Sequence, residues 1–225
     1  MKQIIFISFM VSILFLCHVS VNGQNRLLTF EELGDVPEYQ SLEIALLDAD
    51  NVYKLTLRDQ QIEELPQKIT KLKNLQVLNL SKNHNLNIEQ SLKVLSSITN
   101  LQILSFDETS LVTLPEEIEL FQNLRVLGLD QNPNMDLGQI LLRVSKLKKM
   151  QYLFLAKNNI SALPPEIEKI QSVEYLYLNN NRLNELPKEM GNLMNLEILD
   201  ISGNEISKEE ISQTKVFLPN AMIMH

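Results

Sequence analysis

Hydrophobic residues return along this 225-residue chain in the frame L-x-x-L-x-L-x-x-N. The frame occurs seven times, and its first positions are Val52, Leu75, Leu101, Leu124, Met150, Val173 and Leu196. Successive starts lie 23, 26, 23, 26, 23 and 23 residues apart. A period of this size indicates units that cannot each enclose a core and must bury their apolar side chains against neighbouring units.

Within each frame, apolar and variable positions alternate with a period of two, which predicts a short strand. In the segment 152–155, Leu153 and Leu155 are expected to point inward, whereas Tyr152 and Phe154 point outward. Successive strands should pair in parallel at about 4.8 Å. Parallel strands need crossover connections, and these are strongly biased to the right hand. The pattern therefore predicts one long parallel sheet in a right-handed coil, with the sheet on the concave side.

The return segments fall into two kinds. Four of the 23-residue units contain Leu-Pro, at 65–66, 114–115, 163–164 and 186–187. Proline fixes an extended or turning backbone and shortens any helix. The two 26-residue units, 75–100 and 124–149, lack this pair and carry apolar residues at helical spacing. We expect extended segments or short helices on the convex side, with true helices in the two longer units.

A polar residue closes each frame, and in five units it is asparagine. These five residues are Asn83, Asn132, Asn158, Asn181 and Asn204, with Gln60 and Thr109 at the corresponding positions of two further units. An asparagine amide can donate to and accept from backbone groups where the chain turns off the strand. We expect a structural asparagine ladder that links neighbouring turns.

These letters and spacings resemble the leucine-rich repeat, over residues 52–225. The resemblance implies an α/β fold, a right-handed solenoid shaped as a curved horseshoe, and a surface used for binding. We divide the chain into a signal peptide (1–23), an amino-terminal helical cap (24–51), seven repeats (52–220) and a carboxy-terminal capping strand (221–225). Apolar residues at 42, 45, 46 and 49 predict one buried helix face in the cap.

The first 23 residues have the three parts of a secretory leader. Lys2 supplies the positive start, residues 4–17 are mostly apolar, and Val21-Asn22-Gly23 offers a cleavage site before Gln24. The apolar run is shorter than the roughly 20 residues that span a membrane. Cleavage after Gly23 is the favoured interpretation, beside an uncleaved anchor and lipid attachment at Cys17. The mature protein is then secreted or extracytoplasmic, including the cell surface, with no membrane insertion.

The charge and the cysteine content disfavour several classes of binding partner. The net charge of −8 disfavours nucleic acid and anionic membranes, which are bound by basic surfaces. Cys17 is the only cysteine, so the mature chain has no disulfides and no thiolate ligands. Cysteine-free repeats resemble exported bacterial leucine-rich-repeat proteins. We expect a monomer that uses no cofactor and no metal.

The sequence contains little evidence for a catalytic site. His84 and His225 are the two histidines beyond the leader, and neither is placed for a hydrolase triad. No phosphate-binding glycine motif occurs among the six glycines. Asp107 and Asp130 do occupy the same position in adjacent repeats. Such a pair could bind a cation or raise the pKa of one carboxyl, so a cation-dependent lectin or enzyme at this acidic edge stays as the alternative.

Outward strand positions form two columns across the predicted sheet. In-register stacking brings together Tyr152, Phe154, Tyr175 and Tyr177, with Val126 beside them. Exposed aromatic clusters are typical of binding hot spots, although aromatic residues also simply favour strands. We interpret the chain as a non-catalytic module that binds a protein on its concave face, through this cluster and the neighbouring Asp107 and Asp130.

Overall fold

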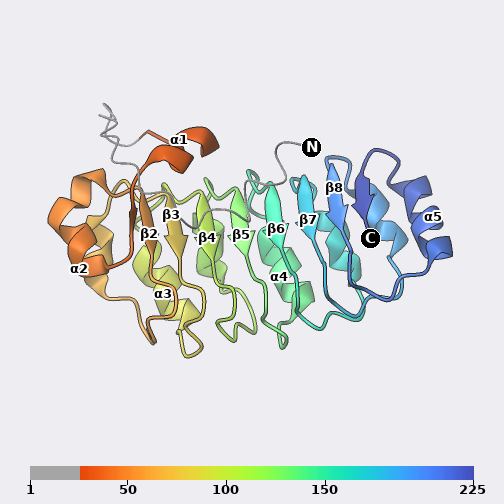
Figure 1. Cartoon of the computed structure of the whole chain (residues 1–225), viewed down its shortest axis with the longest axis horizontal. Coiled ribbons are helices and arrows are strands. Elements are labelled where there is room, and N and C mark those ends of the chain that lie inside the picture. The colour runs from red at the N-terminus through yellow and green to blue at the C-terminus, as the bar shows by residue number, and fades with distance from the viewer. Residues whose placement is uncertain (1–25) are drawn as a thin grey trace.

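The structure is a computed structural model that describes residues 26–225. The leader, its cleavage site and Cys17 lie outside the described residues. These described residues form one open sheet of nine parallel strands in sequence order, with helical segments behind it (Figure 1). The strands are β1 Glu38–Tyr39, β2 Lys54–Thr56, β3 Val77–Asn79, β4 Ile103–Ser105, β5 Val126–Gly128, β6 Tyr152–Phe154, β7 Tyr175–Tyr177, β8 Ile198–Asp200 and β9 Met222–Met224.

The register of the sheet follows the repeat. Lys54 pairs with Val77, Val77 with Ile103, and the same phase continues to Ile198 and Met222. The middle residue of each of the seven repeat strands is buried; Leu104, Leu127 and Leu153, for example, have no exposed surface. We call the opposite side of the strands the sheet face; it carries the outward columns. The predicted parallel α/β solenoid is confirmed.

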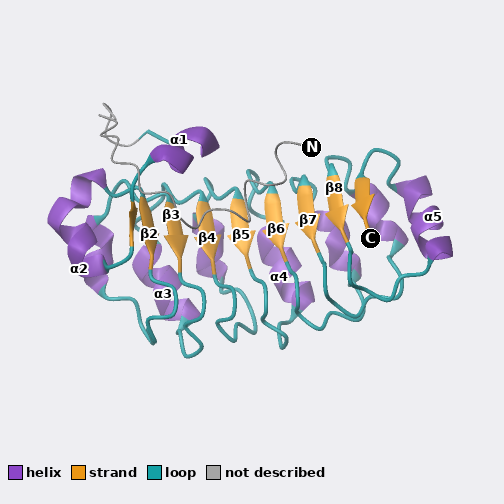
Figure 2. Cartoon of the chain, in the orientation of Figure 1, coloured by secondary structure: helices purple, strands orange, loops and turns teal. Residues whose placement is uncertain are grey.

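The segments behind the sheet differ between the two kinds of unit, as predicted (Figure 2). The 26-residue units contain the α-helices α3 Ile88–Leu95 and α4 Leu137–Val144. Asn87 and Asp136 cap them by accepting the backbone N–H three residues on. The Leu-Pro units contain the 3₁₀ helices η2 Gln67–Lys71, η3 Glu116–Leu120, η4 Pro165–Lys169 and η5 Lys188–Asn192. Proline precedes each of them and fixes the entering φ at a position whose missing N–H is not needed for the helix hydrogen bonds.

The core is one continuous apolar layer between the sheet and the return segments. Phe106 and Phe121 are its largest fully buried side chains. Because every repeat contributes to this layer and contacts chiefly its neighbours, the array should unfold cooperatively.

The asparagine ladder runs along the turns that leave the strands. The Asn132 carboxamide oxygen accepts the N–H groups of Thr109 and Leu111, and its nitrogen donates to Phe106 O. The Asn181 amide makes corresponding bonds to the preceding repeat. In all seven repeats the residue before the ladder position has a left-handed backbone. These residues are Asp59, Lys82, Glu108, Gln131, Lys157, Asn180 and Gly203. The left-handed residue turns the chain off the strand. The next side chain is buried in five repeats, half-buried at Asn204 and exposed at Gln60.

The amino-terminal segment differs from the helical cap that we expected. It contains α1 Phe30–Asp35, strand β1, α2 Leu42–Ala45 and the 3₁₀ helix η1 Leu46–Asn51. Strand β1 extends the sheet by pairing with β2, and α2 buries Leu42 and Ala45 in the main core. Helix α1 instead lies at the amino-terminal ends of the first strands, above them in Figure 1, and packs against Tyr53 and Val77. Residues 42–51 are helical and pack their apolar residues against the core, and β1 adds a two-residue strand that pairs with the otherwise free edge of β2.

At the other end, α5 Lys208–Phe217 precedes β9, which pairs in parallel with β8. The sequence pattern did not predict α5. Its amphipathic signal is weak because only Ile211 and Thr214 are buried among polar neighbours.

Candidate functional site

Four aromatic side chains stack on the sheet face of β6 and β7, and we call them the aromatic cluster: Tyr152, Phe154, Tyr175 and Tyr177. Tyr152 pairs in register with Tyr175, and Phe154 pairs with Tyr177. Their ring centroids lie 4.3 Å and 4.6 Å apart, with interplanar angles of 7° and 4°. Parallel strands are spaced at about 4.8 Å, so in-register pairing alone brings the rings face to face. The structure places together the four aromatic residues that the sequence indicated.

All four rings are half-buried and retain accessible surface. The Tyr175 hydroxyl donates to a Glu197 carboxylate oxygen at 2.7 Å, and this bond raises the pKa of Tyr175. Burial raises the pKa of Tyr177 as well. Both phenols therefore stay neutral at physiological pH. Val126, which pairs with Tyr152, is half-buried at the edge of the cluster.

Residues 26–35, which we call the strap, pack against the amino-terminal ends of the strands in the first repeats. Leu28 and Leu33 are buried in an apolar cluster with Tyr53 and Val77, and this cluster is separate from the main core. The start of the first outward column is thus covered at Val77 and partly at Ile103. A sequence pattern could not show this, because the strap carries no repeat.

The strap reaches the aromatic cluster through Phe30. Its ring contacts Tyr152 edge-on at 5.8 Å between centroids, with an interplanar angle of 72°. The Arg125 guanidinium lies over the Phe30 ring, 3.8 Å from its centroid. Such a cation–π contact contributes about 0.5–2 kcal/mol. The exposed part of the aromatic cluster is therefore centred on Phe154, Tyr175 and Tyr177, and Tyr152 is its boundary with the strap.

A third outward column, which we call the polar rail, was not predicted from the sequence. It occupies the second position of the frame and includes Gln76, Gln102, Arg125, Gln151 and Glu174. Arg125 Nε donates to Gln151 Oε1 at 2.7 Å, and Gln151 Nε2 donates to both carboxylate oxygens of Glu174. Aligning the repeats would have revealed this column, because four of the five residues at this position carry an amide or a carboxylate.

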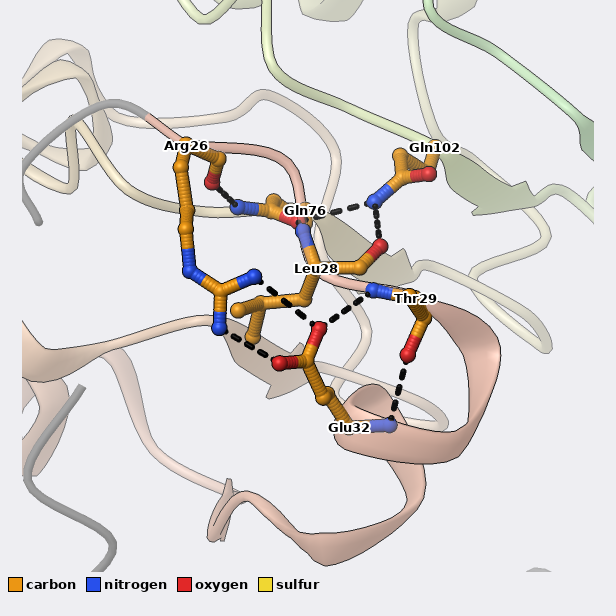
Figure 3. A network of polar contacts seen from close by, with 6 residues as sticks. All are labelled: Arg26, Leu28, Thr29, Glu32, Gln76 and Gln102. Carbon is orange, nitrogen blue, oxygen red and sulfur yellow. Dashed lines mark hydrogen bonds and ion pairs between the residues drawn. The ribbon is translucent and has the colours of Figure 1, made fainter.

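Two members of the polar rail hold the strap (Figure 3). Gln76 Oε1 accepts the N–H of Leu28, and Gln76 Nε2 donates to Arg26 O, both at 2.8 Å. Gln102 Nε2 donates to Leu28 O at 2.8 Å and to Gln76 Oε1. Both glutamines are buried. The strap itself is braced by Arg26, which pairs with Glu32 of α1, and by the Thr29 capping box.

Asp107 and Asp130 lie next to each other, just beyond the strands. Asp107 Oδ1 accepts the N–H of Asp130 at 3.0 Å, and its Oδ2 accepts the Ser105 hydroxyl at 2.7 Å. Asp130 Oδ1 accepts the N–H of Ala156 at 2.7 Å. Burial, with the negative charge of Asp107 added, raises the pKa of Asp130 to about 7. The two carboxyl groups together therefore carry less than two full negative charges near neutral pH. Their oxygens already accept hydrogen bonds from the neighbouring turns.

Within residues 26–225, no group of three or more His, Cys, Asp or Glu side chains is placed to hold a metal ion. A cleft of about 240 Å³ lies at the end of the polar rail, between Arg125, Gln151, Glu174 and two lysines, Lys148 and Lys149. It opens beside the strap contact of Arg125 and apart from the carboxylate pair.

Comparisons with known proteins agree with this geometry. A family model described as "Leucine-rich repeat region" matches residues 112–213. Internalin C2 from Listeria monocytogenes has a similar fold, with a TM-score of 0.56 and 18% sequence identity over 80% of this chain and 83% of that protein. Residues 112–213 are therefore a leucine-rich repeat region, and the described chain has the leucine-rich repeat solenoid fold. The repeat frame continues the family pattern upstream of the matched region, to residue 52.

Two further solved structures are similar to this chain. One is a leucine-rich repeat protein from Leptospira interrogans, with 25% identity, a TM-score of 0.46 and coverage of 84% of this chain. The chain spans 58% of the length of that protein. The other is an internalin from Listeria monocytogenes, with 17% identity, a TM-score of 0.46 and coverage of 82% of this chain and 64% of that one. No curated protein matches the chain.

Proposed function

We propose that this leucine-rich repeat protein is a non-catalytic, exported recognition module that binds a protein partner through the aromatic cluster on its sheet face. The observation that carries the proposal is the stacking of four aromatic rings on a surface that the core does not use. The middle residues of β6 and β7, Leu153 and Leu176, already fill the core and are fully buried. The aromatic rings therefore contribute contact area to the surface at little cost to the fold.

The physical properties of the cluster suit a protein ligand. Tyrosine offers a large apolar ring with a hydroxyl that can donate and accept, at a low cost in side-chain entropy. Stacking fixes the rings before a ligand arrives, so little further ordering is needed on binding. Glu197 holds the Tyr175 hydroxyl and fixes its orientation. The surface is thus pre-organised.

The alternative, a cation-dependent lectin or enzyme at the acidic edge, is less well supported. The oxygens of Asp107 and Asp130 accept backbone and serine donors, which leaves few free lone pairs for a cation. The raised pKa of Asp130 also lowers the charge that would attract a cation. These bonds favour a structural role for the pair.

Export is the second part of the proposal, and it is supported by the composition of the leader. None of the helices among residues 26–225 has the length and apolar character needed to cross a bilayer. The repeats contain no cysteine, so folding outside the cytoplasm requires no disulfide formation.

The proposal is tested by capture of partners from extracellular and surface fractions, followed by titration of each identified partner. The test variant carries Tyr175→Ala and Tyr177→Ala. The control carries Val112→Ala and Leu120→Ala, which truncate two side chains that are 55% and 53% exposed away from the sheet face. Loss of two hot-spot rings should weaken binding by about thirtyfold or more, since a hot spot contributes about 2 kcal/mol or more.

Circular dichroism must show that both variants are folded. A partner that binds the tyrosine variant and the control with equal affinity would refute the assignment of the binding surface. A binding affinity that disappears with a chelator and returns with Ca²⁺ would instead favour the acidic edge.

A further inference from the structure

The strap is bound to the amino-terminal ends of the first strands in the way that a receptor binds an extended peptide. Gln76 and Gln102 contact the backbone of Arg26 and Leu28, not their side chains (Figure 3). One amide accepts an N–H and donates to a carbonyl two residues earlier, and the second amide donates to the carbonyl of Leu28. Bonds of this kind recognise an extended backbone whatever its sequence.

Two neighbouring subsites hold the side chains of the strap. Leu28 is 2% exposed and packs in the apolar cluster formed with Tyr53 and Val77. Two residues later, Phe30 lies between Arg125 and Tyr152. The site therefore selects an apolar residue followed, two positions on, by an aromatic residue.

The strap is not required to close the solenoid. The end of the main core is covered by β1 and by Leu42 and Ala45 of α2, whereas the strap belongs to a second cluster on the opposite side of the sheet. Departure of the strap would expose Gln76 and Gln102 to water, which can satisfy their amides. It would leave the main core intact.

We propose that the surface beneath the strap is a peptide-binding groove, formed by Gln76, Gln102, Tyr53, Val77 and Arg125, and filled here by the chain's own residues 26–30. Its partner is a peptide segment of another protein with the same apolar-x-aromatic spacing, extended at the apolar residue and helical from the aromatic residue onward, as the strap is here. It enters by displacing the strap. This inference rests on the proposed recognition function and names the partner's chemistry. Because Phe30 touches Tyr152, a bound peptide would continue into the aromatic cluster.

The strap competes strongly with a free peptide for the groove, because the strap is part of the same chain. A short tether gives an effective concentration on the order of 1 mM, so a free peptide must overcome this advantage. The wild-type protein should therefore bind a free peptide weakly, and a protein with a weakened strap should bind it more tightly.

The experiment uses a fluorescently labelled peptide with the sequence of residues 26–35 and fluorescence anisotropy on the full chain. The weakened-strap variant carries Leu28→Asp and Phe30→Ala. It should bind the peptide at least tenfold more tightly than wild type. A second weakened variant, Thr29→Ala with Glu32→Ala, breaks the helix cap and the Arg26 ion pair without touching the groove, and should show the same direction of change.

Two controls make the result specific. Adding Gln76→Ala and Gln102→Ala to the weakened variant should reduce peptide affinity at least tenfold, and a peptide with the same changes at 28 and 30 should not bind. Ile44→Ser, at a side chain 60% exposed on the amino-terminal segment, should leave binding unchanged. Peptide affinity that is equal in wild type and in both weakened variants, with their circular dichroism unchanged, overturns the proposal. So does affinity that is insensitive to the two glutamines.

The experiments distinguish failure of the peptide-binding groove from failure of the proposed function at the aromatic cluster. Absence of peptide binding, combined with partner capture that depends on Tyr175 and Tyr177, removes the groove and keeps the aromatic site. Tight peptide binding, combined with capture that is insensitive to those tyrosines, supports the groove and removes the aromatic site.

Discussion

Replacing Asn132 by alanine tests the role of the asparagine ladder in the centre of the array. Asn132 is fully buried, and its side-chain oxygen accepts the N–H groups of Thr109 and Leu111 at 3.1 Å and 3.0 Å. Alanine removes this acceptor from both N–H groups. The carbonyls that Asn132 bonds are better protected: Phe106 O also accepts the Thr109 hydroxyl, and Leu129 O also accepts the Asn158 amide.

The magnitude follows from the two donors. A buried N–H without an acceptor costs about 1–3 kcal/mol, so Asn132→Ala should lower the free energy of unfolding by about 2–6 kcal/mol. Asn204, at the last ladder position, is only half-buried and accepts one N–H, from Leu183. Asn204→Ala should therefore cost about 1–2 kcal/mol. The difference between the two positions is part of the prediction.

The assay is urea denaturation followed by circular dichroism. With a slope of about 2 kcal/mol per molar, the Asn132 variant should unfold at a urea concentration lower by about 1–3 M. A single transition is expected, because neighbouring repeats share their interfaces. The control is Asn192→Ala, which removes an exposed amide that contacts Glu168 and should change stability by less than about 0.5 kcal/mol. If the Asn132 variant unfolds at the same midpoint as the Asn192 variant, the ladder does not stabilise the array.

Three further outcomes can be measured. Asp130→Asn should add about 1–3 kcal/mol of stability at pH 8 and almost none below pH 4. The folded carboxyl titrates near 7 and the ordinary one at 3.8, so the folded wild type binds more protons and loses stability as the pH rises through that window; parallel denaturation curves at the two pH values would contradict this. Gly203→Ala should cost about 1–2 kcal/mol, because φ there is +69° and a Cβ would meet Asn180 Oδ1 at 2.6 Å, and an unchanged melting temperature would disprove it. Amino-terminal sequencing of exported protein should begin at Gln24; an intact leader or a lipid on Cys17 would show that cleavage is wrong.

The repeat frame determined much of this protein by sequence alone. Leucines at fixed phase specify which strand positions are buried, and a constant phase specifies the parallel register. Together they place Tyr152 beside Tyr175 and Phe154 beside Tyr177 without any tertiary information. Local patterns also separated the helical units from the Leu-Pro units, because proline and helical spacing act locally. Local periodicity is sufficient wherever each unit contacts only its neighbours.

Only the tertiary structure decided where residues 26–35 lie. Leu28 meets Gln76 and Gln102, which are 48 and 74 residues away, and no periodicity links them. The two glutamines are buried members of a polar column, and their amides bond the strap backbone. Helix α5 escaped prediction for a similar reason, because its few buried side chains are set by the neighbouring η5 and not by its own pattern. Contacts that cross many repeats depend on the complete surface, which the order of residues within one repeat does not contain.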